Sequence, residues 1–248
     1  MIFKKFYSDE EFTSSSQGLI DMIDSTNHGT PHTEVFKKRV KGELADICHD
    51  AFYIAEKDGE CVSRLWNGWG RHNDSVGNFG DFHTLDTCRG QGLGGKLLNM
   101  WYEDVMNIKD KPIGLFCTSS QMIAKAYEKY GMKGIFADGI GGPSYMPLGD
   151  SPEKFSDLCD LYYTKSDTLI RKKATFEFRH EIDLLLKFTF MMMGIDFGIG
   201  DMPNLEQALL FKNDVTSLYF SQNGHCVGWS VDDQIQLHPL YKKSDILQ

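Results

Sequence analysis

The segment Arg89-Gly90-Gln91-Gly92-Leu93-Gly94 has the residue types and spacing of an anion-binding turn. It lies between a strand-like run at residues 76–85 and a run at residues 97–105 whose apolar positions recur at helical spacing. Glycines leave backbone N–H groups uncovered, and the N-terminus of the following helix contributes the positive end of its dipole. A strand, a glycine turn and a helix in this order predict a site for a pyrophosphate.

Two common phosphate-binding patterns fit this turn poorly. Gly90, Gly92 and Gly95 match the dinucleotide pattern G-x-G-x-x-G. Asp110 lies near the distance expected for a ribose-binding acid, but it precedes the next predicted strand instead of ending it, which weakens this interpretation. A Walker loop is excluded because Leu97 stands where a Ser or Thr hydroxyl must reach magnesium.

A third pattern, Arg-x-x-Gly-x-Gly, is carried by Arg89, Gly92 and Gly94. A second motif follows a predicted strand at residues 113–117: residues 120–132 read Ser-Gln-Met-Ile-Ala-Lys-Ala-Tyr-Glu-Lys-Tyr-Gly-Met. In order and distance, the two segments resemble the acyl-CoA pyrophosphate loop and the Asn-x-x-Ala-x-x-x-Tyr-Glu-Lys-x-Gly-Phe helix of the GNAT superfamily of N-acetyltransferases.

The second motif departs from the family pattern at three positions, where Ser120 replaces Asn, Ile123 replaces Ala and Met132 replaces Phe. A serine can still cap the helix by accepting an N–H hydrogen bond, and a methionine can still fill an apolar socket. The resemblance covers about residues 1–148.

The resemblance implies acetyl-CoA as cosubstrate and no metal. Backbone N–H groups from Gly90 to Gly95 would hold the pyrophosphate, with Arg89 assisting. The strand that ends at Leu85 would pair with the pantetheine arm and offer an N–H to the developing oxyanion. The cofactor-binding positions implied are Leu85, Arg89, Gly90, Gln91, Gly92, Leu93, Gly94, Gly95 and Ser120.

Three residues are candidates for proton transfer. Tyr127 occupies the position that in this family often donates a proton to the departing CoA sulfur, although it can equally be part of one helix's buried face. On the strand before the turn, alternation places Asp81 and His83 on one face, and either can serve as general base. Asp81 can instead bind the charge of the acceptor.

The flanking pattern predicts the elements that position these residues. A strand at residues 2–7 precedes helices at residues 10–23 and 33–48, and residues 51–56 and 61–66 form a hairpin. With the glycine turn, its helix, the strand at 113–117 and the helix at 120–132, this is the element order of the family. The expected fold is α/β: a GNAT-like, mixed and mostly antiparallel central sheet flanked by helices.

The chain of 248 residues exceeds one minimal domain of this kind, so we expect a catalytic domain at residues 1–150 and a smaller α+β region at residues 151–248. Helical patterns at residues 152–163 and 174–190 precede strands at residues 215–220, 226–230 and 235–238. These strands echo the earlier hairpin, and a degenerate partial repeat is one interpretation. His180-Glu181 begins like a zinc motif, but position 184 is Leu, so the pair is expected on a helix surface.

The composition of the chain limits the classes of binding partner that we expect. A net charge of −9 disfavours nucleic acid, and the most hydrophobic window, residues 188–195, is too short to cross a membrane. The cysteines are scattered without metal-ligand spacing, which indicates reduced thiols in a cytoplasmic protein. A homodimer is compatible with the sequence.

The leading hypothesis is an N-acetyltransferase that transfers an acetyl group from acetyl-CoA to a primary amine of a small molecule or protein. The alternative is a CoA-binding regulatory or interaction module without catalysis, and a third interpretation is a nucleotide-binding enzyme.

Overall fold

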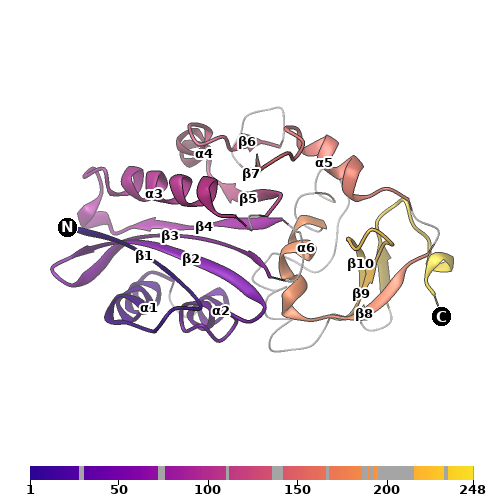
Figure 1. The fold of residues 1–248 in the computed structure, drawn as a ribbon, viewed down its shortest axis with the longest axis horizontal. Helices are drawn as coiled ribbons and strands as arrows, with labels where there is room; N and C mark the ends of the chain where they lie inside the picture. The colour runs from indigo at the N-terminus through magenta and orange to yellow at the C-terminus, as the bar shows by residue number, and fades with distance from the viewer. Residues whose placement is uncertain are drawn as a thin grey trace.

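The computed structural model describes residues 1–27, 31–71, 76–109, 112–135, 142–165, 168–185, 189, 193–194, 215–231 and 234–247. The strands among these residues form two β-sheets (Figure 1). The larger, seven-stranded sheet has the order β1-β2-β3-β4-β5-β7-β6. Its strands are β1 Ile2–Tyr7, β2 Cys48–Lys57, β3 Glu60–Gly70, β4 Gly77–Thr84, β5 Gly114–Ser119, β6 Lys133–Gly134 and β7 Gly142–Pro147.

Only the β4–β5 pair of this sheet is parallel, and every other pair is antiparallel. Helices α1 (Ser14–Asn27) and α2 (Pro31–Val40) cover one face, and α3 (Leu93–Asn107) covers the other (Figure 1). Helix α4 (Gln121–Glu128) follows β5, after the short helix η1 (Asp86–Cys88) and α3. The expected α/β fold, with a mixed and mostly antiparallel central sheet flanked by helices, is confirmed.

The alternation of side chains along each strand explains which residues pack on each face of the large sheet. Phe52 and Trp66 are cross-strand neighbours and pack on Phe36 of α2, whereas Tyr53 and Leu65 belong to the opposite core beneath α3. Strands β2 and β3 are buried along most of their length, because helices cover both faces of the sheet.

The second sheet follows residue 150 and has the order β11-β10-β9-β8. Its strands are β8 Ile170–Lys173, β9 Val215–Phe220, β10 Cys226–Val231 and β11 Gln234–Leu237. The helices of this region are α5 Phe155–Tyr162, η2 Phe176–Phe178, α6 Arg179–Asp183 and η5 Lys243–Asp245. The strands at 215–220, 226–230 and 235–238 are thus confirmed, and β8 was not anticipated.

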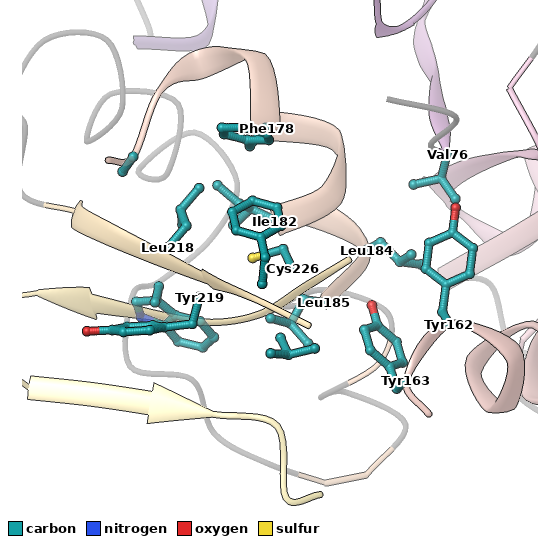
Figure 2. Close-up of a cluster of buried hydrophobic side chains, with 14 of the residues drawn as sticks. Val76, Tyr162, Tyr163, Phe178, Ile182, Leu184, Leu185, Leu218, Tyr219 and Cys226 are labelled. Atoms are coloured by element: carbon teal, nitrogen blue, oxygen red, sulfur yellow. The ribbon is translucent and has the colours of Figure 1, made fainter. Parts of the chain in front are cut away.

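One buried cluster connects this region to the large sheet. Figure 2 shows Ile182 of α6 facing Leu218 of β9, while Tyr162 of α5 lies beside Val76, immediately before β4. Phe116 of β5 belongs to the same cluster. The smaller region is therefore packed against the end of the large sheet where β4 and β5 begin.

Several predicted boundaries are wrong. The first helix begins at Ser14, so Phe12 lies outside it and is 44% exposed. The second ends at Val40, because Gly42 takes a left-handed φ of 75° and the chain turns there. The helix expected at 174–190 begins as η2 at Phe176 and continues as α6, and residues 184, 185 and 189 are also helical; residues 186–188 and 190 lie outside the described residues.

The prediction for His180-Glu181 is also wrong. Both side chains are buried, at 1% and 2% exposure, because α6 lies between the two sheets instead of on the surface. All six cysteines are free thiols, and Cys88 is packed in the core beneath α3. Within the described ranges, no helix combines the length and apolar character needed to cross a membrane.

Candidate active site

The glycine turn lies between β4 and α3 with its backbone uncovered. Gly90 and Gly92 have φ values of 77° and 73°, which is the left-handed conformation that glycine adopts without steric cost. A Cβ added at Gly90, Gly92 or Gly95 would meet no atom within 4 Å, so no side chain fills this corner. The turn is open to a ligand of some size.

The amides of this turn are also unpaired. Lys96 is the first residue of α3 whose N–H reaches a backbone carbonyl, that of Gly92, at 3.2 Å. In the part of the chain that the structure describes, no hydrogen bond uses the N–H groups from Gly90 to Gly95. Consecutive free N–H groups and the positive end of a helix dipole form an anion-binding surface.

Gly94 has a different role from its neighbours. A Cβ there would lie 2.6 Å from the ring tip of Phe82 on β4, so the absence of a side chain lets α3 approach the strand closely. The side chain of Leu93 is buried in the core beneath α3, so Leu93 contributes only its backbone N–H to the turn. The side chain of Gln91 is exposed.

Two predicted cofactor residues are engaged within the chain. Leu85 donates its N–H to the Val62 carbonyl at 3.0 Å and accepts from the Cys88 N–H at 2.8 Å. Arg89 folds back, with Nε 3.3 Å from the Thr84 carbonyl and Nη2 2.8 Å from Asp86. Any N–H that β4 offers to an oxyanion therefore comes from a residue before Leu85.

Strands β4 and β5 separate soon after they begin. They pair only at Gly77 with Leu115 and at Asn78 with Phe116, whereas β4 continues to Thr84 and β5 to Ser119. The separated β4 edge carries backbone groups that an extended ligand can pair with, as an added strand does. The open edge leads toward the glycine turn.

A β-bulge shapes β4 within this opening. The register with β3 shifts between Arg64 and Trp66, and Asp81 takes a φ of 47°, a conformation that few non-glycine residues adopt. The regular alternation is therefore interrupted between Phe79 and Phe82, which both pack toward Tyr127 on the α3 side.

Arg64 holds the bulge in place. Its Nε and Nη2 atoms donate to the two carboxylate oxygens of Asp81, at 2.6 and 3.0 Å, and both side chains are buried. Its remaining N–H groups reach the Met22 carbonyl, Thr26 and Asn27 at the end of α1. Asp81 is thus part of a closed ion pair instead of a free carboxylate.

His83 is the cross-strand neighbour of Arg64, so it lies on the same face of the sheet as the Arg64–Asp81 pair. It is half-buried. Burial and the positive charges of Arg64 and Arg89 lower the pKa of His83, which keeps its imidazole neutral and able to accept a proton at pH 7.

Tyr127 lies on the opposite side of β4. Its ring is 4.8 Å from that of Phe79, in an edge-on arrangement, and 4% of the residue is exposed. Among the described residues, nothing hydrogen-bonds to its hydroxyl. Burial raises the pKa of Tyr127, so the phenol remains protonated and available as a hydrogen-bond donor.

The second motif is largely as expected. Ser120 occupies the N-cap position of α4, but its hydroxyl makes no capping hydrogen bond, and the Ser120 carbonyl accepts from Ile123 and Ala124 instead. Met132 is 2% exposed and fills the core beneath α3, as predicted.

The two tryptophans of β3 lie on opposite faces of the large sheet. Trp66 lies on the α2 face, with Nε1 donating to Asp50 at 2.8 Å, whereas Trp69 stacks on His49 on the α3 face. Asp110 of the dinucleotide interpretation lies outside the described residues. The cavity of about 410 Å³ around Tyr163 and His238 belongs to the C-terminal region and includes none of the predicted site residues.

Sequence reasoning missed Arg64 and a buried polar group formed by Asn78, Arg179, His180 and Asp183. An arginine within the predicted strand at residues 61–66 was a signal, because a buried cation needs a partner. The second group had no signal, since its members are brought together by tertiary packing alone.

No protein-family model matches the chain, and no curated protein matches its sequence. Solved structures are similar in fold. An acyl-CoA N-acyltransferase from Pseudomonas aeruginosa is 13% identical, with a TM-score of 0.45, and the match covers 58% of this chain and 98% of that one. An acetyltransferase of the GNAT family from Staphylococcus aureus Mu50 is 15% identical, with a TM-score of 0.38 and coverage of 60% and 100%. An aminoglycoside 6'-N-acetyltransferase complexed with coenzyme A is 14% identical, with a TM-score of 0.40 and coverage of 61% and 99%.

At these identities the likeness concerns fold alone. In its own order of elements, from β1 to α4, the N-terminal part of the chain follows the arrangement that its two motifs imply. Over about three fifths of its length, the chain is similar in fold to acetyltransferases of the GNAT family.

Proposed function

We propose that the chain is an N-acetyltransferase that moves an acetyl group from acetyl-CoA to a primary amine. The observation that supports this most directly is the run of unpaired amides from Gly90 to Gly95, at the start of α3 and beside the opening between β4 and β5. The amides would hold the pyrophosphate, with Arg89 adding a positive charge. The pantetheine arm would lie along the open edge of β4.

In the proposed reaction the neutral amine nitrogen attacks the thioester carbon, and an N–H of β4 stabilises the oxyanion. The C–N bond forms, the C–S bond breaks, and the sulfur leaves with the bonding electrons. His83, on the α1 and α2 face, would take the amine proton directly or through a water. Tyr127, on the α3 face, would donate to the leaving sulfur.

The pair Arg64–Asp81 limits the choice of base. Both Asp81 oxygens accept from Arg64, so proton uptake by Asp81 would break a buried ion pair. Proton uptake by His83 would leave this ion pair intact. For Tyr127, the raised pKa opposes full proton transfer, and its contribution would be a hydrogen bond to the developing thiolate.

Isothermal titration with acetyl-CoA tests the cofactor assignment. Gly92→Asp places a carboxylate among the amides and should weaken binding at least tenfold. Gly149→Asp is the matched control, because Gly149 also has a positive φ, 61°, and open space around its Cβ position. No saturable binding to the unmodified protein, or equal affinity in both variants, would refute the proposal.

A CoA-release assay over a panel of primary amines tests the chemistry. Tyr127→Phe should keep acetyl-CoA affinity and lower turnover, because the variant removes one hydroxyl from an otherwise unchanged ring. Full turnover in this variant would remove Tyr127 from the mechanism. Acetyl-CoA binding without turnover on any amine would favour the non-catalytic CoA-binding module instead.

A further inference from the structure

The closed end of the opening between β4 and β5 is in contact with the C-terminal region through the side chain of Asn78. Asn78 Nδ2 donates to Asp183 Oδ2 at 2.5 Å, and Asn78 Oδ1 accepts from Arg179 Nη1 at 2.7 Å. The same oxygen lies 2.6 Å from His180 Nδ1. These three partners all belong to α6, and each is at most 5% exposed. One short helix of the C-terminal region therefore contacts one side chain of β4 with three of its residues.

Asn78 lies at the point where β4 and β5 separate. The two strands pair at Gly77 with Leu115 and at Asn78 with Phe116, and no later residue of β4, all of which the structure describes, pairs with β5. Packing at Gly77 is close, because a Cβ there would lie 2.7 Å from Leu115 Cδ2. The hydrogen bonds from α6 thus act on the last paired residue before the opening.

The neighbouring strand is anchored to the same region. Phe116 of β5 is 1% exposed and belongs to the buried cluster that also contains Ile182 of α6 and Leu218 of β9. Its ring lies 5.5 Å from that of Phe155 on α5, in an edge-on arrangement. Both partners of the last β4–β5 pair therefore contact C-terminal residues, and Figure 1 shows α6 at this end of the large sheet.

An asparagine suits this position because its side chain donates from one end and accepts at the other. Asp183 accepts a hydrogen bond and Arg179 donates one, so a single amide serves both groups. A buried carboxylate or cation that loses such a partner is costly. The contact therefore resists displacement of β4 relative to α6.

We propose that Asn78 is a positioning residue through which α6 fixes where β4 and β5 separate. It would thereby fix the edge of β4 along which the pantetheine arm lies, so this inference rests on the proposed function. Asn78 acts through the backbone of β4 and does not touch the cofactor. The C-terminal region is then a working part of the acetyl-CoA site, although it supplies none of the groups that contact acetyl-CoA.

An exchange of the amide and the carboxylate tests this proposal. Asn78→Asp removes the donor and places a second carboxylate against Asp183, so repulsion should displace β4 from α6. The double variant Asn78→Asp with Asp183→Asn contains both groups again, with their places exchanged: the amide donates to the carboxylate, which also accepts from Arg179. Work at pH 8 disfavours a proton shared between two carboxylates.

Titration calorimetry with acetyl-CoA is the first measurement. We expect Asn78→Asp to weaken binding by about tenfold or more, because small displacements of a binding edge have effects of this size. The double variant should bind within about twofold of the unmodified protein. Asn78→Gln keeps the same groups on a longer side chain; if Asn78→Asp does not fold, the same loss is expected of this milder variant. A double variant that binds as weakly as Asn78→Asp would overturn the proposal.

Two comparisons separate positioning from a general loss of stability. ADP has the diphosphate and lacks the pantetheine arm, so its affinity should change less than about twofold in Asn78→Asp. Leu218→Ala is the control for stability, because Leu218 is 0% exposed in the same core and its side chain makes none of these hydrogen bonds. It should lower the thermal unfolding midpoint and keep acetyl-CoA affinity. Equal losses for the two ligands, or in the two variants, would contradict a positioning role.

A readout without ligand keeps this inference distinguishable from the proposed function. Amide hydrogen exchange in β4 and β5, relative to β2, should be about tenfold faster or more in Asn78→Asp, recover in the double variant and stay unchanged in Leu218→Ala. Unchanged relative exchange in Asn78→Asp refutes the inference, whether or not acetyl-CoA binds. If exchange responds as expected and the unmodified protein does not bind acetyl-CoA, α6 does position β4 and the proposed acetyl transfer fails.

Discussion

We expect the Arg64–Asp81 ion pair, which fixes the β4 bulge, to contribute several kilocalories per mole to the free energy of unfolding. Arg64→Met removes the cation and leaves Asp81, whose side chain is 8% exposed, without its charge partner. Unpairing a buried charge in this way costs about 3–5 kcal/mol. Asp81→Asn is milder, because asparagine tolerates the left-handed φ of 47° and keeps one acceptor for Arg64. Its expected cost is about 1.5–3 kcal/mol, the range for a hydrogen bond to a charged group.

The double variant tests the coupling. With neither charge present, no ion is left unpaired, so the loss should be smaller than the sum of the single losses by about 2 kcal/mol. Urea unfolding followed by tryptophan fluorescence gives the free energies of unfolding. The matched control is the exposed pair Arg71–Asp9, also at 2.6 Å, whose coupling should stay below about 1 kcal/mol.

A coupling energy at Arg64–Asp81 no larger than that of the surface pair would refute the argument. It would mean that water reaches the pair or that the bulge is held by other contacts. If the coupling is large, acetyl transfer should also fall in Arg64→Met, because the bulge positions the open edge of β4.

The other predictions concern the glycine turn and the C-terminal core. Gly94→Ala should destabilise the fold by about 1–3 kcal/mol, because its Cβ would lie 2.6 Å from Phe82. Gly95→Ala has open space around its Cβ position and should be neutral or stabilising by up to about 1 kcal/mol. Equal urea midpoints for the two variants would contradict this. Burial lowers the pKa of His238 to about 4. The unfolded chain then binds a proton between about pH 6.5 and 4 that the folded chain does not, so stability should fall across this window as the pH drops, by at most about 3 kcal/mol. His238→Gln should flatten that slope in urea titrations at pH 7, 5.5 and 4.5, and an unchanged slope would show that other groups cause it.

Much of the N-terminal fold was predictable because its signals are local. Glycine spacing at Gly90 and Gly92 identifies a turn whose positive φ values other residues rarely adopt. Helical periodicity after it locates α3, and the apolar runs around Lys57-Asp58-Gly59 locate the β2–β3 hairpin. Each of these depends on the backbone preferences of residues close in the chain.

The details of the site were less predictable. The bulge at Asp81 changes which residues share a face of β4. No local sequence pattern predicts this bulge, because it depends on the pairing of Asp81 with Arg64 across the sheet. The helix boundaries at Ser14 and Val40 were missed for a similar reason: packing and turn geometry overrode the apolar spacing.

The sequence by itself determined the order of the elements, the open glycine turn and the candidate proton carriers His83 and Tyr127. Only the tertiary structure decided that these two lie on opposite faces of β4, and that Asp183 and His180 meet Asn78 although about one hundred residues separate them. The physical reason is that backbone conformation follows from neighbouring residues, whereas the burial and pairing of a charge depend on every segment that packs around it.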